Sequence, residues 1–132
     1  MRNEILNYIV DLINNNKTEI RTVTRRYRNT ESIRPYETPI VFVIDGVETR
    51  KMVCNRDLCE FEVILRIVVY NEDNTSEILN KAIQESINII YSDKFLGGNS
   101  VKPIKVLRIE TDEGWLYPFG IADVRILTAY NM

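Results

Sequence analysis

The sequence has 132 residues, of which 17 are Lys or Arg and 19 are Asp or Glu, so its formal net charge is −2. This length and a hydrophobic content of 45% predict one soluble domain, residues 1–132, whose core needs no disulfide or metal. The absence of His excludes Ser-His and Cys-His triads within the chain. A pI near 5.3 gives no overall basic surface of the kind that DNA-binding proteins present.

An amphipathic helix is predicted over residues 1–16. Its apolar face is formed by residues at helical spacing, namely Ile5, Ile9, Leu12 and Ile13, and three asparagines at 14–16 favour its end. Charged residues interrupt this segment, so it lacks the continuous apolar stretch of a signal peptide. No other run reaches the roughly 18 apolar residues of a membrane span, and we expect a cytoplasmic protein without membrane contact.

Residues 18–28 have a β-type composition with mostly polar alternation, which predicts an exposed or partner-covered strand. Pro35 and Pro39 mark residues 29–39 as a loop. The next residues, 40–44, are apolar and β-branched and predict a buried strand.

Asp45-Gly46 follows that strand and is the strongest two-residue hairpin signal, so a hairpin is expected to continue into a strand over residues 47–54. Cys54 and Cys59 then flank four residues that suggest a second hairpin loop, which would place the two cysteines side by side. In a reducing cytosol we expect two free thiols rather than a disulfide.

The longest strand signal covers residues 59–70, with one wholly apolar face and one mixed face. The mixed face predicts partial cover by another element or subunit. A second helix is predicted from Asn74, whose spacing to Glu77 matches a capping box, to about Ser92, before Gly97-Gly98 ends the segment.

Residues 101–111 and 119–130 predict a final strand pair. The order of the elements predicts an α+β fold with a single, mainly antiparallel β-sheet and two α-helices packed on one face.

Few residues suggest chemistry. Glu72-Asp73 and Asp112-Glu113 are the only close carboxylate pairs, and both fall in predicted loops rather than in an apolar pocket that would raise a pKa. Gly97-Gly98 follows a helix instead of preceding one, so it does not fit a phosphate-binding loop. We expect no catalytic residue, cofactor or metal site.

Charge is distributed unevenly along the chain. Residues 1–30 have six basic and three acidic side chains, whereas residues 71–93 have one basic and five acidic side chains. Opposite patches on one chain suit a head-to-tail contact between identical subunits; an ordinary mixed-charge surface and a nucleic-acid contact through residues 21–28 are the alternatives.

An aromatic run around Trp115 precedes the last strand. Aromatic residues in a loop are typical of interface anchors, and the alternative is that Trp115 folds back onto the core.

The order of these patterns resembles the tail-terminator, or tail-completion, proteins of long-tailed bacteriophages and tailocins. The resemblance covers most of the chain and rests on the opening helix and on the strings at residues 39–43, 61–70, 95–98 and 120–130.

The resemblance implies a homohexameric ring without enzymatic activity. Such a ring caps the end of a tail tube, ends tube polymerisation and offers a surface to the head-tail connector, in a virion tail assembled in the host cytoplasm. Contacts to the sheath or tape-measure protein would be further possibilities, and DNA would only pass through the ring lumen. A neck or head-completion connector is the first alternative, and a nucleic-acid-binding module is the second.

The charge pattern and expected exposure, rather than the resemblance, suggest which residues make the contacts. Candidate subunit contacts pair two sets of charged side chains: Arg21, Arg25, Arg26 and Arg28 with Glu72, Asp73, Glu77 and Glu85. Candidate axial contacts lie in the two predicted turns: Asp45, Gly46, Asp112, Glu113, Trp115 and Tyr117.

Overall fold

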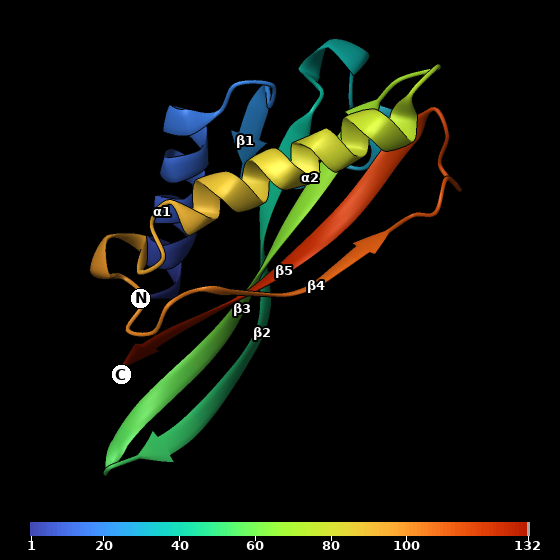
Figure 1. The fold of residues 1–132 in the computed structure, drawn as a ribbon. Helices are drawn as coiled ribbons and strands as arrows, with labels where there is room; N and C mark the ends of the chain where they lie inside the picture. The colour runs from blue at the N-terminus through green and yellow to red at the C-terminus, as the bar shows by residue number, and fades with distance from the viewer. Residues whose placement is uncertain (132) are drawn as a thin grey trace.

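The computed structural model describes residues 1–131 as two helices packed on a five-stranded sheet of order β1-β2-β3-β5-β4 (Figure 1). All strand pairs are antiparallel except β1–β2, which confirms the predicted α+β fold with a single, mainly antiparallel sheet. The elements are α1 (Arg2–Asn16), β1 (Thr22–Thr24), β2 (Ile40–Val53), β3 (Arg56–Tyr70), α2 (Thr75–Tyr91), β4 (Lys105–Thr111) and β5 (Phe119–Asn131), with short 3-10 turns at Thr30–Ser32, Pro35–Glu37 and Leu96–Gly98.

Both helices cover the same face of the sheet, as predicted. Their apolar faces join alternate residues of β3 and β5 in one core, because successive strand residues point to opposite faces. The helices contribute Ile5, Leu6, Ile9, Ile13, Leu79, Ala82, Ile83, Ile89 and Ile90, and the two strands contribute Phe61, Val63, Leu65, Ile67, Val69, Ala122, Val124 and Ile126.

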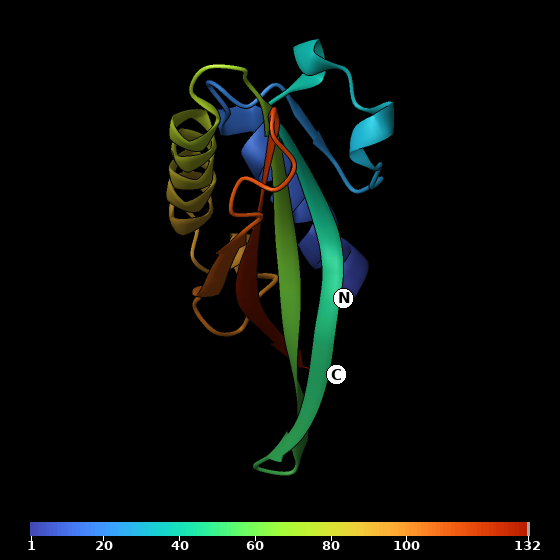
Figure 2. The ribbon, with the colours of Figure 1, turned by 90° about the vertical axis from the view of Figure 1, so that its right-hand side faces the viewer.

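The segment 25–39 crosses to the opposite face of the sheet, on the other side from α2 (Figure 2). It covers a second, smaller core that contains Ile33 and Phe42. The ring of Tyr27 meets Phe42 edge to face at 5.2 Å, and the Arg66 guanidinium lies 5.0 Å from the Tyr27 ring. The predicted strand over 18–28 is therefore wrong outside Thr22–Thr24, because the chain leaves the sheet edge after Thr24 and places the half-exposed Tyr27 ring against Phe42.

Asp45-Gly46 is not a hairpin turn, and that prediction is wrong. β2 runs on without a break, and its pairing with β3 shifts between Asp45 and Glu48, which is a β-bulge. A Cβ on Gly46 would lie 2.6 Å from the Glu62 carbonyl oxygen, so the glycine here permits a close approach of two strands.

The actual hairpin turn lies at Cys54 and Asn55, which have φ values of 52° and 63°. Positive φ at both central residues defines the two-residue turn that matches strand twist, and Val53 pairs with Arg56 on either side of it. The predicted four-residue loop is wrong. Cys54 is exposed at the tip while Cys59 is buried opposite Arg50, so the cysteines are apart and unbonded.

The last predicted strand pair is confirmed with a later start. Pro103 has no N–H to donate and the Ile104 N–H donates to the Lys94 carbonyl, 2.7 Å away, so β4 begins only at Lys105. Before it, the Val101 N–H donates to the Ala129 carbonyl at 2.7 Å, which holds residue 101 beside the end of β5.

Candidate interaction surfaces

The four arginines of the predicted subunit contact do not form one patch. Arg25 turns toward α1, where its guanidinium donates to the side chains of Asn7 and Asn3 at 3.1 and 3.2 Å, and it lies 3.9 Å from the Asp45 carboxylate. Arg28 pairs with Glu37, and this bond holds the pKa of Glu37 below its ordinary value. Both side chains therefore serve the fold of this chain.

Arg21 and Arg26 are more open to solvent. Arg21 donates to the Tyr36 carbonyl at 3.2 Å. The exposed side chain of Arg26 has no ion pair or hydrogen bond to any of residues 1–131. Neither Arg21 nor Arg26 therefore has a carboxylate partner within the described chain.

Glu85, from the acidic set, binds backbone within its own chain. Its carboxylate accepts N–H groups of Thr18, Glu19 and Ile20 at 2.7, 3.0 and 3.5 Å. The backbone N–H groups of the connection after α1 therefore donate to a charged acceptor. Hydrogen bonds to a charged acceptor are stronger than those to a neutral one.

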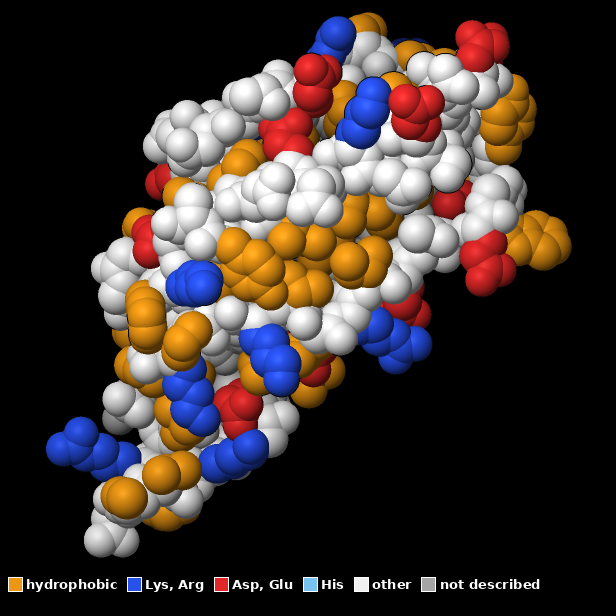
Figure 3. All heavy atoms as spheres, viewed as in Figure 1, with side chains coloured by type: hydrophobic (Ala, Val, Ile, Leu, Met, Phe, Trp, Pro, Cys, Tyr) orange, Lys and Arg blue, Asp and Glu red, His pale blue; other side chains and the backbone are white. Residues whose placement is uncertain are grey.

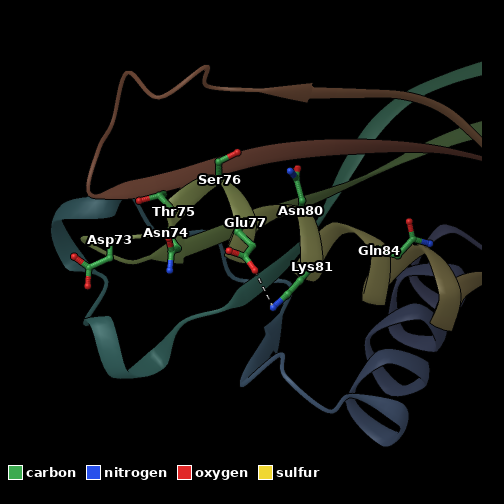
Figure 4. A pocket seen from close by; sticks show the side chains of 8 residues that line it. All are labelled: Asp73, Asn74, Thr75, Ser76, Glu77, Asn80, Lys81 and Gln84. Atoms are coloured by element: carbon green, nitrogen blue, oxygen red, sulfur yellow. Dashed lines mark ion pairs between the residues drawn. The ribbon is translucent and has the colours of Figure 1, made fainter.

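The other acidic residues lie around the N-terminal half of α2. Glu77 pairs with Lys81 one turn on, at 3.3 Å, and Glu72 accepts the Tyr70 hydroxyl at 2.9 Å, while Asp73 is exposed. A shallow pocket lies along this helix face, and Figure 4 shows Ser76 and Asn80 pointing to one side and Glu77 to the other. These side chains do not converge on a common point.

The loop 112–118 presents aromatic side chains to solvent. Trp115 is 85% exposed and Tyr117 is 62% exposed, so the alternative in which Trp115 covers the core is wrong. Asp112 shapes the loop, since its carboxylate accepts the N–H groups of Leu116 and Ile121 at 3.1 and 3.3 Å. Glu113, next to it, is exposed with φ of 56°.

The distal part of the β2–β3 hairpin extends beyond the rest of the sheet (Figures 1 and 2). Val47, Met52 and Val53 are exposed there, Met52 by 71%. The predicted contact at Asp45 and Gly46 lies at the base of this extension rather than at its tip, and Asp45 is paired with Arg2 at 3.2 Å.

A second exposed apolar region, which the sequence patterns did not single out, lies along β4. Figure 3 shows apolar side chains gathered on the helix-bearing face of the molecule. Ile109 belongs to this face because it pairs with Val124 of the core, and it is 45% exposed, as Leu107 is by 42%. The alternation of apolar and polar residues over 106–111 is visible in the sequence. No local pattern, however, indicates that this strand lies at the edge of the sheet.

A partly buried polar network, also not predicted, joins α1 to the base of the hairpin. The Tyr130 hydroxyl donates to the Glu48 carboxylate, Arg50 donates to the same carboxylate at 3.3 Å, and the Arg2 guanidinium lies 4.5 Å from the Phe61 ring centre. The Tyr130 bond is the main cause that lowers the pKa of Glu48. Burial and the same bond raise the pKa of Tyr130.

Within residues 1–131 no three Cys, Asp or Glu side chains come together in a way that suits a metal ion. None of the helices described there has the length and apolarity that a bilayer crossing requires. Comparison with models of protein families gave no match, and neither did comparison with curated proteins.

Proposed function

We propose that this chain is a structural protein of a phage-type tail, which forms a ring on the end of the tail tube, ends tube growth and offers a surface to the head-tail connector. The observation that carries the proposal is the placement of exposed apolar side chains at both ends of the strands. The hairpin tip lies at one end and the loop 112–118 at the other (Figure 1), since Val53 pairs with Arg56 at the tip and Tyr70 pairs with Phe119 at the opposite end of β3.

The two ends are chemically different. The hairpin tip offers the aliphatic side chains of Met52 and Val53 beside exposed Arg56, whereas the opposite loop offers aromatic Trp115 and Tyr117 beside acidic Glu113. A ring whose subunits share one direction along the axis would have two unlike faces. One face can then bind the last ring of a tube while the other does not repeat that surface, which is what ending polymerisation requires.

The experiment is co-sedimentation of the purified chain with tail tubes of a long-tailed phage, followed by electron microscopy. We expect the chain in the tube pellet, ring density at one tube end, and shorter tubes when tube protein polymerises on a tape-measure scaffold in its presence. Tail-free heads are the parallel sample. Binding to heads without binding to tubes would transfer the assignment to a neck connector, and binding to neither would overturn the proposal.

A further inference from the structure

One flank of α2 faces β4. Four residues follow the turns of the helix along this flank, and they are Ser76, Asn80, Ile87 and Tyr91. The Tyr91 hydroxyl oxygen accepts the Val106 N–H at 3.1 Å, which fixes the direction of the flank. Figure 4 shows the first two of these residues on this side, whereas the ion pair of Glu77 and Lys81 lies on the other side. The flank toward β4 is therefore uncharged.

β4 completes an apolar surface with this flank. Val106 pairs with Ile126 and Ile109 pairs with Val124, and both partners belong to the core under the helices. Because paired strand residues point to the same face of a sheet, Val106 and Ile109 point toward the side of α2. Ile109 stays 45% exposed, and Figure 3 shows the apolar side chains gathered on this face of the molecule.

The surface between α2 and β4 is a groove that is open at one end. Toward the start of α2 it widens into a pocket of about 580 Å³, which Ser76, Asn80 and Thr111 line together with the loop 112–118. At the end of α2 the bond between Tyr91 and Val106 closes it. We call this feature the α2–β4 groove.

The layer of helices has an unoccupied position over this groove. α2 packs on β3 and β5, and α1 packs on β1 and β2. Neighbouring helices lie about 8–10 Å apart and neighbouring strands about 4.8 Å apart, so one helix covers two strands. β4 follows β5 in the sheet, and the next helix position therefore lies beside α2 over β4. Neither helix of residues 1–131 occupies it (Figure 1).

The two ends of the groove carry opposite charges. Glu113 lines the open end, is exposed, and has no Lys or Arg beside it in the loop 112–118. At the other end the exposed Lys94 follows α2, and its carbonyl accepts the Ile104 N–H just before β4. The neighbouring Asp93 is already bound to the Tyr8 hydroxyl. A molecule that lies along the groove thus meets a negative charge at one end and a positive charge at the other.

From these observations we infer that the α2–β4 groove binds an amphipathic helix of a partner protein. Ser76 and Tyr91 are about 22 Å apart along α2, so the bound helix has about 15 residues. It buries an uncharged aliphatic stripe in the groove, as helices do in apolar grooves, and it places a Lys or Arg at Glu113 and an Asp or Glu at Lys94. This inference goes beyond the proposed function and does not depend on it.

Titration of the isotope-labelled chain with a designed peptide, followed by NMR, tests the site. The probe is an alanine-based helix of about 15 residues with a leucine stripe, Lys near one end and Glu near the other. We expect saturable shifts of the amide signals around Ile87, Val106 and Ile109. Ile109→Lys should weaken binding at least about tenfold, because docking would bury an ammonium group. Val47→Lys, which changes an exposed aliphatic residue of the hairpin, should not weaken it.

Charge reversal tests the contact at the open end. Glu113→Lys should weaken binding of the same probe. A second probe with Glu at both ends should bind the Glu113→Lys protein more tightly than it binds the unmodified chain. Asp57→Lys is the matched control, because it reverses an exposed carboxylate on the distant hairpin. It should bind both probes as the unmodified chain does.

Four results would overturn the inference: no saturable shift up to about 1 mM probe, shifts confined to other surfaces, full binding by Ile109→Lys, or equal effects of Glu113→Lys and Asp57→Lys. Groove signals that move with the concentration of the chain itself would also overturn it, since the occupant would then be a second copy. Neither tubes nor heads enter this test. Its failure therefore leaves the tail proposal standing, and its success does not support that proposal.

Discussion

Glu48 is the acceptor in a network of side chains that ties the first turn of α1 to the base of the hairpin. Tyr130, 5% exposed, donates to it, and Arg50 and Arg2 add positive charge. These groups lower the pKa of Glu48 from its ordinary value of 4.5, with the Tyr130 bond as the largest cause. Because the folded-state pKa is lowered, the resulting stability is complete above about pH 4.5 and is lost as the pH falls through the folded-state pKa.

Tyr130→Phe removes the hydroxyl and keeps the ring. We expect a loss of about 1 kcal/mol in the free energy of unfolding at pH 7, the usual net contribution of such a bond. The difference from the unmodified chain should shrink below pH 4.5, where Glu48 becomes protonated in both proteins. Urea unfolding at several pH values between 7 and 3 measures this difference.

Tyr70→Phe is the matched control, because Tyr70 donates to an exposed glutamate, Glu72. Its effect should be near zero at every pH. Equal losses in the two variants, or a Tyr130→Phe loss that does not change with pH, would contradict the role assigned to Glu48.

Glu85 offers a second prediction at this scale. Glu85→Ala leaves the N–H groups of Thr18 and Glu19 without their acceptor, and we expect a loss of about 1 to 2 kcal/mol in the free energy of unfolding. Glu77→Ala, which removes only the pair with Lys81 on the same helix, should cost no more than about 0.5 kcal/mol. Urea unfolding of both variants compares them, and equal stability would show that Glu85 does not hold this connection.

Charge patterns in the sequence single out these side chains as candidate subunit contacts, but they do not show which of them are paired within the chain. Arg25 and Arg28 are separated in the sequence from their partners Asp45 and Glu37, and the loop between them packs Tyr27 against Phe42. The contact between Tyr27 and Phe42 is a tertiary one with no local sequence pattern. The set of candidate contacts therefore could be proposed from the sequence, while the division into internal and external ones required the fold.

At the scale of elements, β2 shows how a strong local signal is overridden. Asp45-Gly46 is favourable in a tight turn, yet pairing of β2 with β3 on both sides of the bulge keeps the strand continuous. The turn instead forms at Cys54-Asn55, where Asn tolerates positive φ. Helices and the long β3 were predictable because their apolar periodicity extends over many residues.

The bulge gives a prediction for Gly46. Gly46→Ala would bring a methyl group to 2.6 Å from the Glu62 carbonyl oxygen and 3.0 Å from its Cβ, so β2 and β3 must separate locally. We expect a loss of about 1 to 3 kcal/mol in the free energy of unfolding, as for overpacking elsewhere. Urea unfolding measures it, with Val47→Ala as the control because Val47 is 60% exposed in the same bulge. A Gly46→Ala protein as stable as the control would show that the two strands are not in close contact there.

At the scale of the whole molecule, one sheet separates two kinds of surface. Its β4 edge offers the aliphatic side chains of Leu107 and Ile109, while its ends offer Met52 and Trp115. β3, with 15 residues, sets the distance between the ends at about 45 Å. The residues at the two ends are thus far enough apart to be altered independently.

This separation leads to a prediction for the two ends. Met52→Asp at the hairpin tip and Trp115→Ala in the opposite loop should each weaken binding to one partner, tail tubes or heads, by at least about tenfold, because exposed anchors of this kind often contribute 2 kcal/mol or more. Each variant should keep the other partner. Co-sedimentation with tubes and with tail-free heads measures both, with Tyr36→Ala as a surface control. If one variant lost both partners while its free energy of unfolding stayed that of the unmodified chain, or if neither variant lost any partner, the ends of the sheet would not be the two axial contacts.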